Sequence, residues 1–288
     1  MAKRSEYKRY TRSRAGNVLC FIFLILMGLF SVLPLIYCVC TAFKPLDELL
    51  IFPPRFFVSR PTLENFTALP ALLESLGVPL SVYAFNSVFI TAVTTALQIF
   101  VVSLAAFCFS KSRMKGLTVF FLIVQFSLLY NATTLGVPQY LIFSKLRLID
   151  TYLAYILPAI PSSMGVFLMK QYMDTSIPDS ILEAAKIDGA NIFHIYWRVV
   201  MPITKPAWMT LLLFAFQGIW SIRPTGGTIF SENLKTLPYV MSSITAGGTA
   251  RAGAAMAVTV ILMIPPIIVY FISQSNVMET MSSAGVKE

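Results

Sequence analysis

Charged residues are scarce in this chain of 288 residues: Asp, Glu, Lys and Arg together make up 12% of it, and histidine occurs once. Soluble domains carry about 25% charged residues, so the composition excludes an ordinary soluble domain. Hydrophobic residues make up 57% of the chain, and several apolar runs reach the roughly 20 residues that a membrane-spanning helix needs. The runs are too long and uniform for the alternating strands of a barrel. The sequence therefore predicts an all-α, polytopic membrane protein that forms one domain over residues 1–288.

Catalytic motifs are missing as well. The sequence contains no Gly-x-x-x-x-Gly-Lys-Ser/Thr loop, so we do not expect this chain to hold the phosphates of ATP itself. It also contains no Gly-x-Ser-x-Gly elbow and no His-Glu-x-x-His pair. A lone histidine such as His194 is more often a packing or rim residue than a catalyst. We therefore expect no catalytic residue and no cofactor, and any ATP hydrolysis belongs to a partner subunit.

Cysteine is rare, and its spacing excludes a metal site. The four cysteines all lie in apolar segments, without a Cys-x-x-Cys pair or a Cys/His cluster. They are Cys20, Cys38, Cys40 and Cys108. We interpret them as small apolar side chains that fill space between helices.

The net charge of +9 does not indicate a nucleic-acid partner, because the basic residues are not interleaved with aromatic ones. Six of them crowd the first fourteen residues, directly before an apolar run, which is typical of a cytosolic N-terminus. They are Lys3, Arg4, Lys8, Arg9, Arg12 and Arg14. The apolar run over 18–43 is too long for the core of a signal peptide, so we interpret it as a membrane helix.

The apolar runs predict six transmembrane helices with both termini in the cytosol of a bacterial cell, in its inner membrane. The predicted spans are 16–43, 83–109, 117–137, 152–173, 206–222 and 251–275. The segments 1–15, 176–204 and 276–288 then lie in the cytosol, and the loops 44–81 and 223–250 lie outside. Prolines within the first, fourth and sixth spans predict kinks.

The densest cluster of charges and helix signals lies between the fourth and fifth predicted spans. Ser176 followed by Asp179 three residues later predicts a capping box at the start of a helix. Gly189 suits a left-handed residue just past the end of that helix. Asn191 can cap a second short helix, which Pro202 would stop or kink. The sequence thus predicts two cytosolic helices joined by a sharp bend.

The same segment carries residue types at fixed offsets: Glu183, Ala184, Ala185, Asp188, Gly189, Ala190 and Pro202. This pattern resembles the "EAA" signature of permease subunits of bacterial binding-protein-dependent ABC importers, with a methionine before the proline where leucine is usual. The resemblance implies that residues 176–204, which we call the coupling loop, dock in a groove on an ATP-hydrolysing ABC subunit. Glu183 would then offer its carboxylate to a basic group, the two alanines would allow close packing, and Gly189 would make the bend. The helix pattern alone would rather favour an amphipathic helix that only caps its own bundle, and the full motif between two spans reverses that preference.

Three further segments resemble the carbohydrate branch of that family, the second permease of the maltose-transporter type. They are the proline-rich 52–66, the Asn86-Ser87 pair and the tail 276–288, which ends in Gly-Val-Lys-Glu. The resemblance implies a heterodimer with a second, homologous permease inside the membrane lipid. It also implies an extracytoplasmic solute-binding protein, for which the two outer loops are candidate docking surfaces.

Polar, uncharged residues within the spans are candidates for the path of a sugar or oligosaccharide, because they suit hydroxyl-rich substrates. The candidates are Asn86, Gln125, Asn131, Gln217 and Trp220, whose ring could stack on a sugar. The alternative is that these side chains join helices to one another. The lack of charge in the spans favours a neutral substrate over a glycerol-phosphate ester.

Two other functional classes remain open from the sequence. A self-sufficient secondary carrier is disfavoured, because the predicted spans contain no Asp or Glu at mid-depth, where ion-coupled carriers usually need ionisable groups. A membrane scaffold would tolerate changes in the coupling loop without a transport defect. A membrane enzyme is disfavoured, because the sequence contains no catalytic constellation.

Overall fold

The computed structural model describes residues 14–74, 77–112, 114–129, 135–223, 227–248 and 251–285. Within these ranges every regular element is helical, which confirms the predicted fold class. Three helices are long and apolar enough to cross a bilayer: α1 (Arg14–Ala42), α5 (Leu80–Lys111) and α15 (Ala252–Gly285). They contain the first, second and sixth predicted spans, and α15 continues ten residues beyond the predicted end of its span. The expected tail 276–288 therefore begins as helix.

Two further candidate spans are pairs of helices with a sharp bend between them. The fourth predicted span consists of α8 (Leu153–Ala159) and α9 (Ser163–Ser176), which meet at 41°. The fifth is α13 (Lys205–Trp220), which meets the preceding helical segment at 80°. Pro158 lies within α8 and Pro161 lies in the break before α9. A proline lacks the amide that a helix needs, and its ring clashes with the carbonyl four residues earlier, so prolines at these positions favour the bend.

The third predicted span differs from the structure. Its described part contains α6 (Leu117–Ser127), which at 1.5 Å per residue is about 16 Å long, roughly half of the hydrocarbon core of a bilayer. Residues 130–134 lie outside the described residues, and α7 (Gly136–Lys145) follows them. The described residues thus hold three helices long enough to span and two bent pairs that count as candidate spans, in place of six simple spans.

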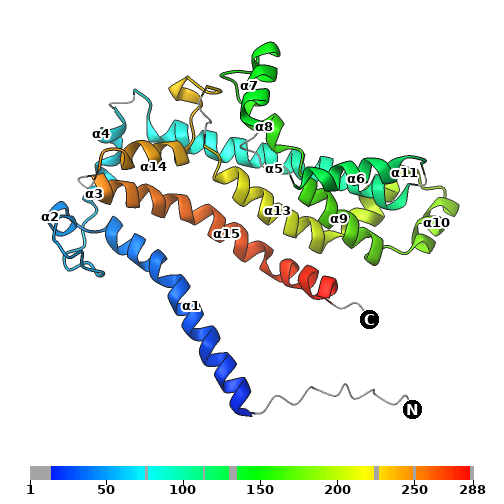
Figure 1. The fold of residues 1–288 in the computed structure, drawn as a ribbon, viewed down its shortest axis with the longest axis horizontal. Helices are drawn as coiled ribbons and strands as arrows, with labels where there is room; N and C mark the ends of the chain where they lie inside the picture. The colour runs from blue at the N-terminus through cyan, green and yellow to red at the C-terminus, as the bar shows by residue number, and fades with distance from the viewer. Residues whose placement is uncertain are drawn as a thin grey trace.

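The helices form one elongated bundle (Figure 1). Helix α5 packs along α9 and α13, and α15 packs along α13 and α1. The short helices α2 (Leu46–Leu49), α3 (Glu64–Thr67) and α4 (Leu69–Glu74) lie at one end, and α10 (Asp179–Ile187) and α11 (Ile192–Ile195) lie at the other (Figure 1). The two predicted outer loops and the coupling loop therefore occupy opposite ends of the bundle.

The predicted outer loop 223–250 is not a free loop in its described parts. It contains η3 (Glu232–Leu234) and α14 (Leu237–Thr245), which packs against α15 and α5. Leu237, Val240 and Ile244 of α14 are buried in the same apolar cluster as Tyr83. The sequence of this short segment does not reveal the burial, because the partner surfaces lie far away along the chain.

Helix α1 has an apolar surface that the chain itself does not cover. No residue in its most apolar window is buried, and large side chains such as Leu19 and Phe30 are exposed. Apolar surface on this scale requires hydrocarbon or a partner helix around it.

Candidate functional site

The coupling loop begins with an extended junction between α9 and α10. The predicted capping box is wrong: Ser176 is the last residue of α9, and α10 starts at Asp179 after Pro178, whose side chain offers no capping hydrogen bond. Ile177 is extended, with φ −117° and ψ 98°, as expected for a residue before proline. Its side chain is fully buried. Ile177 thus anchors the junction between α9 and α10 in the apolar cluster below the loop.

The bend after α10 confirms the prediction for Gly189. This residue has φ +79°, in the left-handed region that glycine favours. The amide of Gly189 donates to the carbonyl of Lys186, and the amide of Ala190 donates to the carbonyl of Ala185, each at 3.0 Å. These two bonds form a Schellman motif, which satisfies carbonyls left open at the helix end.

The second helix of the loop is capped as predicted. The side-chain oxygen of Asn191 accepts the amide of His194 at 2.8 Å, so Asn191 is the N-cap of α11. The chain then continues as a π-helix, η2 (Tyr196–Val200), and as α12 (Met201–Ile203), which contains Pro202. A proline lacks the amide that an α-helix needs at this position, and π-turns are one way to accommodate the gap.

The sharp bend into the membrane lies at Thr204, two residues after the predicted position. The hydroxyl of Thr204 donates to the carbonyl of Val200 at 2.9 Å. Across the bend, the indole nitrogen of Trp208 donates to the carbonyl of Met201 at 3.1 Å. These bonds satisfy backbone groups that the break exposes, so the angle between the loop and α13 is held from both sides.

One face of the coupling loop is embedded in the bundle. Leu182 of α10 and Ile195, Tyr196 and Val200 of the second helical segment are buried in one apolar cluster with residues of α5 and α9. Their partners in that cluster include Val102, Ala106, Phe107, Met169, Met173 and Ile177. Since close-packed interiors transmit strain, this cluster is one route by which the loop and the helices beneath it are coupled.

Other residues of the loop remain exposed. They include Glu183, Ala184 and Asp188 of the predicted site. Large apolar residues of the loop are exposed as well: the exposed fraction is 86% for Ile187 and 68% for Phe193, and Ile181, Ile192 and Trp197 are also open. None of them was predicted as part of the site, although bulky apolar residues on either side of a glycine bend were a usable signal. Exposed apolar groups among charged ones are typical of a surface that binds a partner.

Asn86, predicted to line the substrate path, lies in the first turns of α5 and is fully buried. Its amide donates to the carbonyls of Asn233 and Lys235 at 2.7 and 2.9 Å, and its oxygen accepts the hydroxyl of Tyr152 at 2.7 Å. The side chain is therefore occupied in joining α5 to η3 and to the start of α8.

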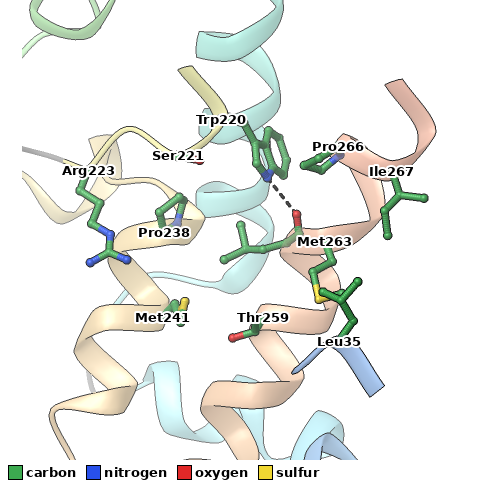
Figure 2. A pocket seen from close by; sticks show the side chains of 11 residues that line it. Leu35, Trp220, Ser221, Arg223, Pro238, Met241, Thr259, Met263, Pro266 and Ile267 are labelled. Carbon is green, nitrogen blue, oxygen red and sulfur yellow. Dashed lines mark hydrogen bonds between the residues drawn. The ribbon is translucent and has the colours of Figure 1, made fainter. Parts of the chain in front are cut away.

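Trp220, at the end of α13, lines a cavity of ≈ 340 Å³ between α1, α13, α14 and α15 (Figure 2). Its indole nitrogen donates to the carbonyl of Leu262 at 3.0 Å, and Phe216 stacks on its ring at 5.6 Å. Figure 2 shows the exposed side chain of Arg223 on the other side of the cavity from Ile267. Tryptophan and arginine at one cavity can bind a sugar ring and a negative charge.

The remaining path candidates lie elsewhere. Gln217 is exposed on α13, and Gln125 is half-buried on α6. Asn131 lies outside the described residues. Of the four candidates that the structure describes, Trp220 alone lines the cavity in Figure 2.

Comparison with known proteins supports the resemblance. No protein-family model matches the chain. Protein LplC of Bacillus subtilis (strain 168) is 32% identical over 228 residues, which cover 75% of this chain and 72% of LplC. YtcP of the same organism, the permease protein of a polygalacturonan/rhamnogalacturonan transport system, is 28% identical, with 90% of this chain and 93% of YtcP covered.

A solved structure shares the fold. It is that of a bacterial ABC transporter involved in the import of the acidic polysaccharide alginate, and it matches with a TM-score of 0.77 at 23% identity. The match covers 93% of this chain and 99% of the other. Through these relatives the chain is a multi-pass membrane protein, and it belongs to the family of sugar-type permease subunits of ABC importers.

Proposed function

We propose that this permease carries an oligosaccharide into the cell and that its coupling loop receives the driving force from a separate ATP-hydrolysing subunit. The observation that carries this proposal is that the loop is both anchored and exposed. Part of it is packed against α5 and α9, whereas Glu183, Ile187 and Phe193 remain exposed and form what we call its outer face. A helix that only capped its own bundle would bury Ile187 and Phe193.

The outer face suits a groove with an apolar floor and a basic rim. Ile187 and Phe193 would serve as anchors, because buried apolar and aromatic side chains at the centre of an interface contribute most of its binding energy. Glu183 and Asp188 would form charge-assisted hydrogen bonds with basic groups at the edge. The Schellman bend at Gly189 fixes the position of Ile187 relative to Phe193.

The opposite end of the bundle is the proposed extracytoplasmic side, with both termini in the cytosol. Phe52 is 92% exposed there, and Leu50 and Phe57 are also open. These residues form our candidate surface for a solute-binding protein. The uncovered apolar length of α1 suits membrane lipid and a second, homologous permease.

An oligosaccharide is the proposed substrate because YtcP is named for pectic polysaccharides and the solved structure for alginate. Arg223 beside Trp220 favours sugars that carry a carboxylate over neutral ones. Replacing Arg223 with Gln should reduce uptake of oligogalacturonides and leave uptake of neutral oligosaccharides unchanged. Equal loss of both would assign Arg223 a structural role.

The decisive experiment is affinity purification of the chain from its native membrane in mild detergent, with mass spectrometry of the proteins that accompany it. We expect an ABC ATPase and a second permease with the wild type. The Glu183→Lys variant should lose the ATPase and keep the permease. Glu64→Lys makes the same charge change at an exposed site on the other end of the bundle and should keep both. A chain that purifies alone and transports in liposomes without ATP would overturn the proposal in favour of a secondary carrier.

A further inference from the structure

The last turn of α5 makes polar contacts with two other elements at the end of the bundle that holds the coupling loop. The ammonium of Lys111 donates to the carbonyl of Ile177 at 2.6 Å and to a carboxylate oxygen of Asp179 at 3.0 Å. The neighbouring Ser110 donates to Asp174 of α9 at 2.6 Å. One turn of α5 is thus bonded to the end of α9, to the extended junction and to the start of α10.

The burial of Lys111 and the charges around it show that its contact with α10 is a specific one. Its side chain is only 9% exposed, whereas that of Asp179 is 65% exposed. A lysine side chain is seldom buried to this extent unless its charge is paired and hydrogen-bonded. The charges also suit the helices they stand on, because a cation is favourable at the C-terminus of α5 and an anion is favourable at the N-terminus of α10.

The space beside this contact is open. A cavity of ≈ 700 Å³ separates the end of α5 from much of α10 and α11, and Cys108, Glu183, Lys186 and Phe193 line it. Leu182 of α10 and Phe107 of α5, which belong to one buried apolar cluster, also line it. Within the described residues, Lys111 provides the ion pair that joins α5 to α10.

We propose that Lys111 is a positioning residue that fixes the N-terminal end of α10 to α5, so that a force applied to the coupling loop moves α5. This inference rests on the proposed function of the loop. Without the ammonium, α10 could tilt about the apolar cluster into the open cavity. The motion would then be taken up at the loop and would not reach the membrane span.

The test measures the separation of α5 and α10 in the full complex, with its ATPase, purified from the native membrane. Spin labels are attached to the native Cys108 and to Ser180→Cys, an exposed site on α10, after Cys20, Cys38 and Cys40 are replaced by Ala. The distribution of label separations is recorded without nucleotide and after trapping with ATP and vanadate. Lys111→Met, Lys111→Arg and Lys170→Met are compared with the parent. Lys170 is the matched control, because it forms an ion pair with Asp174 within the single helix α9.

We expect one narrow distribution in the parent, in Lys111→Arg and in Lys170→Met, unchanged by nucleotide. Lys111→Met should broaden the distribution without nucleotide and shift it with ATP and vanadate. In that variant the ATPase should still co-purify, while uptake is lost. A Lys111→Met distribution as narrow as that of Lys170→Met without nucleotide overturns the positioning role, whether or not an ATPase is bound. Loss of the ATPase from the parent complex would instead count against the proposed function.

Discussion

The side-chain oxygens of Ser103 and Tyr196 lie 2.6 Å apart in the interior of the protein, although the residues are 93 positions apart. Both residues are almost fully buried. The bond joins the middle of α5 to η2, and the ring of Tyr196 also packs on that of Phe107 at 5.7 Å. The coupling loop is therefore attached to α5 by a specific polar contact as well as by apolar packing.

Replacing Tyr196 with Phe tests the contribution of this contact. The variant removes one hydroxyl and leaves the ring in place, and Ser103 keeps its bond to the carbonyl of Phe100. We expect the free energy of unfolding to fall by about 1 kcal/mol, measured as a lower midpoint of thermal unfolding in detergent. Tyr172→Phe, on the half-buried Tyr172 of α9, is the control and should leave the midpoint unchanged. An unaltered midpoint in Tyr196→Phe would show that the bond adds no net stability.

Gly189 is where backbone conformation, rather than packing, limits the choice of residue. A Cβ added there would meet no atom within 4 Å, yet φ is +79°. Gly189→Ala should therefore destabilise the bend by about 1–2 kcal/mol through strain alone.

The readout for Gly189→Ala is hydrogen exchange of the backbone amides at positions 189 and 190 and of the neighbouring amides in α10 and α11. Exchange at these amides should become faster. Gly28→Ala places a methyl group in equally open space on the regular helix α1 and should not slow or speed exchange in the loop. If both variants leave exchange unchanged, the bend tolerates a side chain.

The parts of the coupling loop that could be predicted are those fixed by neighbouring residues. The roles of Gly189 and Asn191 depend only on residues a few positions away in the chain, so they could be predicted from the sequence. The capping box at Ser176 failed because Ser176 is the last residue of α9 and α10 starts only after Pro178. The partner that the Asp179 carboxylate has instead, Lys111, is 68 positions away, which a local rule cannot anticipate.

The same limit explains the membrane region. Long apolar runs predicted α1, α5 and α15, since length and hydropathy alone identify them. The burial of α14 and the shortness of α6 depend on which surfaces meet in three dimensions. Asn86 was predicted to be a substrate contact because a polar residue in a span can either line a substrate path or join helices to one another. Its hydrogen-bond partners in η3 and at the start of α8, which the sequence does not reveal, favour the second role.

Asn86→Leu should therefore act on stability. It would leave two buried carbonyls and the hydroxyl of Tyr152 without their present partner, each at a cost of about 1–3 kcal/mol. We expect a loss of about 3 kcal/mol or more, seen as a large fall in the unfolding midpoint. Gln217→Leu, at an exposed position on α13, is the control and should leave the midpoint nearly unchanged. A stable Asn86→Leu protein that has lost only transport would return Asn86 to the substrate path.

Asp150 gives the fold a dependence on acid. Its carboxylate accepts the amides of Phe230 and Ser231 at 2.9 and 2.8 Å and also the hydroxyl of Ser231. The bond from the Ser231 side chain, followed by that from the Ser231 backbone, lowers the pKa of Asp150 below its ordinary value. A carboxylate with a lowered pKa stabilises the folded state above its ordinary pKa of about 3.9, and this stability is lost as the pH falls through the lowered value.

The measurement compares the unfolding midpoints of the wild type and Asp150→Asn at pH 7, pH 5 and pH 3. We expect Asp150→Asn to be less stable by the same margin at pH 7 and pH 5, where the wild-type carboxylate is ionised in both folded and unfolded states. At pH 3 the margin should shrink, because the unfolded wild type then binds a proton that the folded state resists. A margin that grew towards pH 3 would mean that the pKa of Asp150 is raised in the folded state, so that its carboxylate does not accept the amides of Phe230 and Ser231.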